Sequence, residues 1–260
     1  MFHKFRLWDV ASSPRVDHFI ANSRYTARRI WRFYGRESSV IYPPVDLARF
    51  PLKEDKEDFF VTVSRLVPCK KVDLIAAACA WAGKRLLVVG AGPEMRKVKG
   101  AAAGQVEILG YQPDHVVVDL VRRARAFIFA AREEFGIAGV EAQAAGTPVI
   151  AFGAGGALET IRGIFPGDRP QAGTTGIFFR EPTAASLIEA LEWFEGCRDK
   201  IEPQACRDNA ARFDRPRFHE EFRRLVKGRW EQFQSGGLSK RRPGKSGRLL
   251  RQAARSLLER

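Results

Sequence analysis

Two glutamates eight residues apart mark the stretch of the sequence with the clearest potential for chemistry. Glu133 follows a short apolar segment, and Phe135-Gly136-Ile137 is then expected to begin a helix. The free backbone N–H groups and the dipole of a helix start suit a phosphate or sugar hydroxyls. Glu141 lies about one turn further in, and carboxylates accept hydrogen bonds from hydroxyl groups. The pattern therefore indicates a site for a polyhydroxylated, phosphorylated ligand.

The elements around these glutamates alternate between short apolar strands and helices. The predicted strands are 59–64, 85–89, 106–109, 126–130, 148–152 and 176–179, and the predicted helices are 73–81, 113–125, 136–145, 158–161 and 182–195. This alternation implies an α/β fold with a parallel sheet covered on both faces, which is a Rossmann-like lobe. Ligands bind such sheets at the carboxyl ends of the strands, and this is where Glu133 is expected.

The remaining segments divide the chain further. Residues 1–42 are predicted to hold a strand (16–21), a helix (25–34) and a second strand (40–42), with Asn22-Ser23 as the N-cap and Gly35 as the stop of the helix. Residues 43–58, rich in proline and charge, are predicted to be a linker. We assign 59–200 to the Rossmann-like domain, 201–235 to C-terminal helices (204–212 and 216–233), and 236–260 to a basic tail.

A glycine-rich turn at Gly90-Ala91-Gly92-Pro93 offers a second phosphate-binding hypothesis. It lacks the third glycine of a dinucleotide-binding loop, because Met95 stands there. We therefore interpret it as a plain turn at the end of a strand.

Several motifs in the same order resemble glycosyltransferase family 4. Beside Glu133 to Glu141, they are 19–23 (FIANS), 41–46 (IYPPVD), 64–73 (SRLVPCKKVD), 144–151 (AAGTPVIA) and 153–161 (GAGGALETI). The similarity runs from about residue 10 to about residue 225, and it is strongest to bacterial mannosyltransferases of O-antigen and exopolysaccharide assembly. The resemblance implies the C-terminal donor half of a GT-B fold, with 1–42 as a remnant of the N-terminal acceptor lobe.

The resemblance also implies roles for individual residues. Glu133 would hold the hydroxyls of the donor sugar. Arg65 and Lys70, with Lys71 as the alternative to Lys70, would neutralise the diphosphate and stabilise the leaving nucleotide. The remaining donor-binding residues would be Glu141 for the ribose, the backbone of Phe135, Gly136 and Ile137 for the sugar and diphosphate, and Gly110 with Tyr111 for the nucleobase. Because the two cations would replace Mg²⁺, no metal and no cofactor are expected.

The function implied by the resemblance is retaining transfer of a hexose from a nucleotide sugar, GDP-mannose, to a lipid-linked or polysaccharide acceptor. Two alternatives are open: a non-catalytic nucleotide-sugar-binding half or subunit of a split glycosyltransferase, and a nucleotide-sugar epimerase. A GT-B active site lies between two lobes. We therefore expect a separate N-terminal lobe as a partner, and weak donor binding with little transfer by this chain alone.

Charge and cysteine content bear on partners and location. The formal charge is +14, and residues 236–260 hold eight Lys/Arg against one Glu. Binding of the tail to a membrane surface and a merely solvated tail are both open, and a nucleic-acid partner is not predicted. The four cysteines form no C-x-x-C pair and are interpreted as reduced thiols. We expect a cytoplasmic protein, peripheral at the inner face of the plasma membrane if the tail binds lipid.

Overall fold

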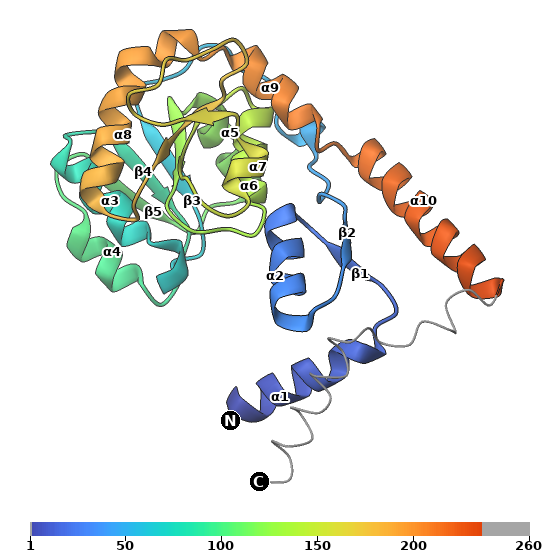
Figure 1. Ribbon diagram of the computed structural model, residues 1–260. Helices are drawn as coiled ribbons and strands as arrows, with labels where there is room; N and C mark the ends of the chain where they lie inside the picture. The colour runs from blue at the N-terminus through green and yellow to red at the C-terminus, as the bar shows by residue number, and fades with distance from the viewer. Residues whose placement is uncertain (1, 236–260) are drawn as a thin grey trace. The chain divides into compact units, whose positions relative to one another are not determined.

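The computed structural model describes residues 2–235, and its chain divides into two units (Figure 1). The larger unit is Pro43–Arg215. The smaller unit takes its described residues from 2–42 and from 216 to 235. The predicted basic tail, 236–260, lies outside the described residues.

A seven-stranded parallel sheet forms the centre of the larger unit. Its strands lie in the order β5-β4-β3-β6-β7-β9-β8. Their bounds are β3 Phe60–Val63, β4 Leu86–Val89, β5 Val106–Gly110, β6 Ala126–Phe129, β7 Val149–Phe152, β8 Gly163–Ile164 and β9 Gly176–Phe179. β4, β7 and β9 are buried along their whole length, which explains why they are continuous apolar runs rather than alternating ones.

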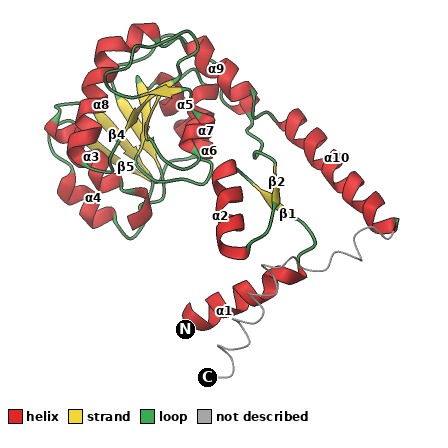
Figure 2. Cartoon of the chain, in the orientation of Figure 1, coloured by secondary structure: helices red, strands yellow, loops and turns green. Residues whose placement is uncertain are grey.

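Helices cover both faces of this sheet (Figure 2). α3 (Val72–Trp81) packs against α4 (Met95–Ala101) and α8 (Ala184–Cys197) on one face. On the other face lie α5 (Asp114–Arg123), α6 (Ile137–Ala144), the short α7 (Ala157–Thr160) and α9 (Pro203–Ala211), with α6 packed on α9. The larger core forms on the first face, where Phe60 of β3 meets Phe194 of α8 edge to face. The fold is thus the expected Rossmann-like α/β lobe.

The strand order fixes where a ligand can bind. From β3 the chain runs outward through β4 to β5, then crosses back to β6 on the other side of β3. β3 pairs with both β4 and β6, in the registers Phe60↔Leu86 and Phe60↔Ala126. The loops that follow β3 and β6 therefore diverge to opposite faces and leave a crevice between them, the switch point of doubly wound sheets.

The smaller unit is built from few elements. They are α1 (Phe2–Ser12), β1 (Phe19–Ala21), α2 (Arg24–Tyr34), β2 (Ser38–Val40) and α10 (Arg215–Gln234). β1 and β2 pair in parallel. As the sequence predicts, the hydroxyl of Ser23 caps α2 by accepting from the N–H of Thr26 (3.0 Å), and Gly35 ends the helix with φ 60°.

Several elements differ from the sequence-based expectations. The strand expected at 40–42 lies at Ser38–Val40, and α1, α4 and β8 were not predicted. α4 buries only Val98, so its sequence carries little periodicity. Single-turn 3-10 helices, also unpredicted, are η1 (Ser13–Arg15), η2 (Leu47–Arg49), η3 (Pro68–Lys70) and η4 (Arg198–Lys200).

The segment 43–58, expected as a linker, packs onto the larger unit. Val45 and Phe50 are buried, and the N–H of Val45 donates to the carbonyl of Phe213 (2.8 Å). The expected pair of C-terminal helices is divided, because α9 belongs to the larger unit and α10 almost wholly to the smaller. Proline and charge suggested a linker, but the buried Val45 and Phe50 anchor this segment.

Candidate functional site

The loop after β3 is held in place by the glycine-rich turn after β4. The N–H of Leu66 donates to the carbonyl of Ala91 (3.0 Å), and the N–H of Glu94 donates to the carbonyl of Leu66 (2.9 Å). A Cβ atom on Gly90 would lie 1.8 Å from the carbonyl oxygen of Ser64, so no other residue fits there. This turn therefore supports the β3 loop, in keeping with its interpretation as a strand-end turn.

Two cations project from the β3 loop. Arg65 is exposed, and its guanidinium forms no ion pair or hydrogen bond with the residues described, 2–235. Lys70 ends η3, immediately before Lys71, which is the only non-glycine residue in the described part of the chain with a positive φ (51°). The strained conformation of Lys71 lets α3 begin at Val72, one residue after η3 ends, and so fixes the direction in which the backbone leaves Lys70.

An ion pair joins the β3 loop to the β6 loop. The Lys70 ammonium donates to Oε1 of Glu133, and each side chain is 27% exposed. The sequence places these residues 63 positions apart. The structure therefore brings a predicted phosphate-binding cation and a predicted sugar-binding carboxylate together at the switch point, partly shielded from solvent but still accessible to a ligand.

The β6 loop is supported from behind by the loop after β7. The N–H of Gly156 donates to the carbonyl of Glu133 (2.8 Å). A Cβ atom on Gly156 would lie 2.4 Å from the carbonyl oxygen of Glu134. The two arms of the site, which carry Arg65 and Glu133, thus each rest on a glycine-containing turn of the neighbouring strand.

The start of α6 offers backbone rather than side chains. The Phe135 ring is buried and packs edge to face on Phe213, with 5.3 Å between the ring centroids. Gly136 takes a left-handed conformation (φ 88°) as the N-cap residue, and no side chain caps the helix. Ile137 is 45% exposed. The N-cap position therefore brings no side chain to the first N–H groups of α6, which follow closely after Glu133.

A fully buried polar network fixes α6 and the loop before it. Asn209 of α9 donates to the side-chain oxygen of Gln143 (2.7 Å) and to the carbonyl of Thr160 (2.8 Å). Gln143 donates to the carbonyls of Gly139 and Thr160 (both 3.0 Å). The Thr160 hydroxyl donates to the carbonyl of Gly156 (3.2 Å), the residue that supports Glu133. Neither Asn209, Gln143 nor Thr160 was predicted to bear on the site.

Glu141 lies half-buried in the second turn of α6. No donor among the described residues forms a hydrogen bond with its carboxylate. Burial raises the pKa of Glu141, the Arg49 guanidinium opposes this rise, and the Asp114 carboxylate adds to it. A shielded carboxylate without a hydrogen-bond donor is costly to the fold, and it suits a ligand that brings hydroxyl groups.

Arg49 is a residue of this region that the sequence did not single out. It lies in η2, within the expected linker, and it forms an ion pair with Asp114 at the start of α5 (3.0 Å). Gly110 ends β5, and Tyr111 lies in the short loop between Gly110 and Asp114. Gly110 has φ 70°, and the Tyr111 ring is 80% exposed. Arg49 thus connects the surroundings of Glu141 to the loop predicted to hold a nucleobase.

The arrangement as a whole suits an anionic, hydroxyl-rich ligand. The site offers an exposed cation, an ion pair that a phosphate can open, a helix start without a capping side chain and a half-buried carboxylate. Within residues 2–235, no group of three or more His, Cys, Asp or Glu side chains could hold a metal ion. These features are typical of an α/β lobe of the nucleotide-binding class.

Comparison with known proteins places the chain in a family. Residues 46–213 match the family described as "Glycosyl transferases group 1", and the chain belongs to this family. A D-inositol 3-phosphate glycosyltransferase from Nocardia farcinica is 27% identical over 220 residues, which are 72% of this chain and 46% of that protein. One from a Mycobacterium species is 32% identical over 173 residues, 56% of this chain and 39% of that protein.

Solved structures share the fold. Anabaena Alr3699/HepE, in complex with UDP and glucose, superposes with a TM-score of 0.69 at 22% identity, covering 84% of this chain and 65% of that chain. Sucrose-phosphate synthase from Thermosynechococcus elongatus gives 0.70 at 20% identity, covering 82% and 58%. The larger unit therefore has the fold of a GT-B glycosyltransferase lobe. The chain spans less than half the length of the two curated relatives.

Proposed function

We propose that the larger unit is the donor-binding half of a retaining glycosyltransferase. The observation that carries this proposal is the Lys70–Glu133 ion pair at the switch point between β3 and β6. It supplies both charges that a sugar diphosphate requires, a cation for the phosphates and a carboxylate for the sugar hydroxyls.

The proposed binding step exchanges partners at this ion pair. A donor diphosphate offers its oxygens to Arg65 and Lys70, and Lys70 turns from Glu133 toward the phosphate. The Glu133 carboxylate is then free to accept hydrogen bonds from the hydroxyls of the sugar. The Lys70–Glu133 pair is itself charge-assisted, and the exchange replaces it with charge-assisted hydrogen bonds from Lys70 to the phosphate and from the sugar hydroxyls to Glu133.

The proposed transfer follows from where the cations lie. The bond between the anomeric carbon and the diphosphate oxygen breaks, and its electron pair stays on the diphosphate, where Arg65 and Lys70 stabilise the developing charge. The acceptor oxygen forms the new bond on the same face, and its proton passes to the departing phosphate. The anomeric configuration is retained in this step.

The other donor-binding residues take the nucleoside. Glu141 accepts hydrogen bonds from the ribose hydroxyls, and the N–H groups at the start of α6 contact the sugar and phosphates. Gly110 and Tyr111 flank the base, with Arg49 between this loop and Glu141. The Glu141 carboxylate supports this assignment, because no residue within 2–235 donates a hydrogen bond to it.

The identity of the substrates is part of the proposal. The proposed donor is GDP-mannose, and a UDP-hexose is the alternative, because Alr3699/HepE was solved with UDP and glucose. The proposed acceptor is a lipid-linked or polysaccharide glycan. The names of the curated relatives make a phosphorylated inositol the second candidate.

A second candidate function is a nucleotide-sugar-binding half that becomes active with a facing lobe. The small size of the core in the smaller unit favours it, since Ala21 and Ile41 are the only buried apolar residues among the described residues there. Transfer that appears only when an acceptor lobe is added in trans would support this candidate. Transfer by the chain alone would contradict it, because the chain would then carry a complete active site.

The donor site can be tested without measuring transfer. Cys69 lies in η3 beside Lys70 and is exposed, whereas Cys79, Cys197 and Cys206 are buried. A thiol reagent such as N-ethylmaleimide should therefore modify Cys69 first, and a bound donor should slow the modification. The reaction is followed by intact mass with GDP, GDP-mannose, UDP and UDP-glucose.

The protection should be specific to the site. We expect it to be lost in Arg65→Ala and in Glu141→Ala. The matched control is Arg96→Ala, on α4, which should be protected as well as the original chain. If no nucleotide or nucleotide sugar slows the modification of Cys69, the proposed donor site is wrong.

A further inference from the structure

The net positive charge of this protein comes from residues outside the unit that holds the candidate site. Residues 43–215 contain 23 Lys/Arg and 23 Asp/Glu, so the larger unit is neutral. The described residues of the smaller unit, 2–42 and 216–235, contain 13 Lys/Arg and 6 Asp/Glu. An excess of seven positive charges on these 61 residues is not needed to bind a donor elsewhere, so it points to an anionic partner of the smaller unit.

The long helix α10 carries an apolar surface within this cationic unit. None of its residues, all of which the structure describes, is buried. Four large side chains on it are 39–59% exposed, namely Phe222, Val226, Trp230 and Phe233. At 3.6 residues per turn they fall within an arc of about 80° and form a single line along the helix, which we call the aromatic stripe.

Charged residues are arranged asymmetrically around the aromatic stripe. On the same helical projection, Arg223 lies about 20° and Lys227 about 60° beyond one edge of the stripe, and Arg229 lies about 20° beyond the other edge. The acidic residues of the helix, Glu220, Glu221 and Glu231, lie further away, about 80–100° beyond the nearer edge of the stripe. An apolar line bordered by cations, with acids turned away, is the pattern of a helix that lies in the interface of a bilayer.

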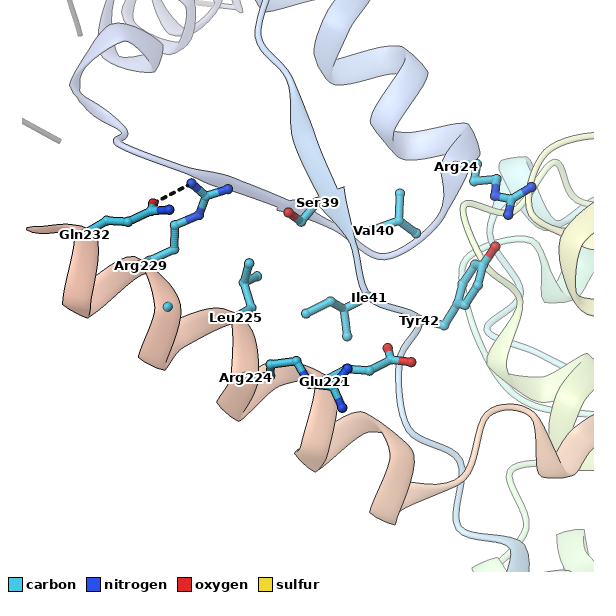
Figure 3. Close-up of a pocket in the computed structure, with 11 residues that line it drawn as sticks. Arg24, Ser39, Val40, Ile41, Tyr42, Glu221, Arg224, Leu225, Arg229 and Gln232 are labelled. Atoms are coloured by element: carbon cyan, nitrogen blue, oxygen red, sulfur yellow. Dashed lines mark hydrogen bonds between the residues drawn. The ribbon is translucent and has the colours of Figure 1, made fainter. Parts of the chain in front are cut away.

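The opposite side of α10 faces the small sheet of the same unit. An open groove of about 580 Å³ separates α10 from β2, and Figure 3 shows Leu225 and Ile41 pointing into it. Glu221, Gly228 and Gln232 also line this groove, but no residue of the aromatic stripe does. The two sides of the helix are therefore distinct, and the stripe is not used to hold α10 on β2.

We infer that the aromatic stripe of α10 and its bordering cations dock the protein on an anionic phospholipid surface. Trp230 and Phe233 stack with centroids 5.6 Å apart, and together with Phe222 and Val226 they can enter the acyl boundary. Arg223 and Lys227 then lie at the level of the headgroups, where each cation contributes about 1 kcal/mol, a factor of about five in affinity.

A lipid surface fits these observations better than a second copy of the chain. Two copies packed through their stripes would bring two smaller units together, each with an excess of seven positive charges. Like charges oppose such an interface, whereas anionic headgroups neutralise them. Within residues 2–235 no helix is long and apolar enough to cross a membrane.

The experiment is flotation of the full chain with vesicles. Vesicles of phosphatidylcholine with phosphatidylglycerol should bind the protein, and vesicles of phosphatidylcholine alone should bind it at least about tenfold less. Trp230→Glu and Phe222→Glu should each lower the affinity for the anionic vesicles by about tenfold or more, since each removes a buried aromatic side chain from the complex. Both positions are exposed, so the variants should fold, as circular dichroism can verify.

A matched control comes from the neutral unit. Trp81 ends α3 and is 85% exposed, so Trp81→Glu makes the same chemical change on the larger unit and should leave vesicle binding unchanged. Trp230→Glu should in turn keep the protection of Cys69 by nucleotide, so that failure of the docking surface and failure of the donor site are told apart.

Three outcomes would contradict the proposal that the aromatic stripe docks on lipid. The first is equal binding of Trp230→Glu and the original chain, which would assign lipid binding to another segment. The second is equal binding to anionic and uncharged vesicles, or no binding to either. The third is an oligomer in sedimentation equilibrium that Trp230→Glu dissociates, which would make the stripe an interface between copies of the chain.

Discussion

The two units of this chain differ in how their apolar residues are used. The larger unit buries its strands under helices on both faces, and only four of its large apolar side chains are exposed. The smaller unit exposes eleven and buries two apolar residues, Ala21 and Ile41, within its described part. It also carries the excess charge. The larger unit therefore has its own hydrophobic core, whereas the smaller unit exposes most of its large apolar side chains.

This difference separates two tasks. The candidate donor site needs side chains that are held rigidly, and the loops that carry Arg65 and Glu133 each rest on a turn of the neighbouring strand. Binding to a large anionic surface needs exposed aromatic and cationic residues, and a unit that buries its apolar residues in a core exposes few aromatic ones. Substitutions in each unit can test whether stability and donor binding belong to the larger unit alone.

The largest contrast is expected from aromatic truncation in the two units. Phe194 is buried against Phe60, so Phe194→Ala should lower the free energy of unfolding by about 3–5 kcal/mol. Trp31 on α2 is 67% exposed, so Trp31→Ala should change it by less than about 0.5 kcal/mol. Urea unfolding followed by circular dichroism measures both. Equal losses would show that the smaller unit has a core of comparable importance.

The second largest effect is expected from the buried polar network of Asn209, Gln143 and Thr160. Asn209→Ala leaves the side-chain oxygen of Gln143 without its donor and should lower the free energy of unfolding by about 1–3 kcal/mol. The network reaches the support of Glu133 through Thr160 and Gly156. Protection of the Cys69 thiol by nucleotide should therefore weaken as well, in the same mass-spectrometric assay.

The control for this prediction lies on the same helix. Gln204 is on the exposed side of α9. Within the described residues, the only hydrogen bond of its side chain is to the carboxylate of Asp208. Gln204→Ala should leave both stability and protection close to those of the original chain. If nucleotide still protected the Cys69 thiol fully in a folded Asn209→Ala variant, the network would contribute to stability but not to donor binding.

A substitution at Glu141 should have opposite effects on stability and binding. Burial raises the pKa of this carboxyl, so the folded state favours its protonated form, and stability is lost as the pH rises through the raised pKa. Glu141→Gln should therefore raise the melting temperature at neutral pH while lowering nucleotide affinity by about tenfold. Nucleotide affinity of the original chain should also fall as the pH is lowered toward that pKa, but not in the variant. A variant that binds equally well would remove Glu141 from the site.

A pH dependence of stability is expected from the segment 43–58. Lys56 donates to the carbonyls of Arg122 (2.8 Å) and Ala145 (3.1 Å), and burial lowers the pKa of its ammonium to about 8. Since the unfolded chain then binds more protons above that pH, the free energy of unfolding should rise between pH 8 and the ordinary lysine pKa of 10.5. Lys56→Met should abolish this slope in thermal melts taken across the range. A slope that survives would place its origin elsewhere.

The sequence predicted the parts of the fold that depend on local pattern. The runs in β6, β7 and β9 are apolar on both faces, and their predicted bounds agree with the structure within one residue at each end. The strand-end rule placed Glu133 at the ligand-binding edge, and the structure brings Lys70 to it. Lys70 and Glu133 were assigned by resemblance, and their roles remain predictions.

The sequence could not supply what depends on distant contacts. Asn209 and Gln143 are 66 residues apart and meet only because α9 packs on α6. Arg49 acts on Glu141 from a segment that its composition marked as a linker. The order of the strands likewise depends on where β6 returns beside β3, and no local pattern encodes that crossing.

The central claim is that the larger unit binds a nucleotide sugar at its switch point. It is tested most directly by the thermal stability of the full chain with GDP-mannose, GDP, UDP-glucose and UDP, because a ligand of the native state raises the melting temperature with concentration. We predict a rise with at least one nucleotide sugar that is absent in Arg65→Ala and preserved in Trp230→Glu. No rise with any of the four ligands, or an equal rise in Arg65→Ala, would contradict the account.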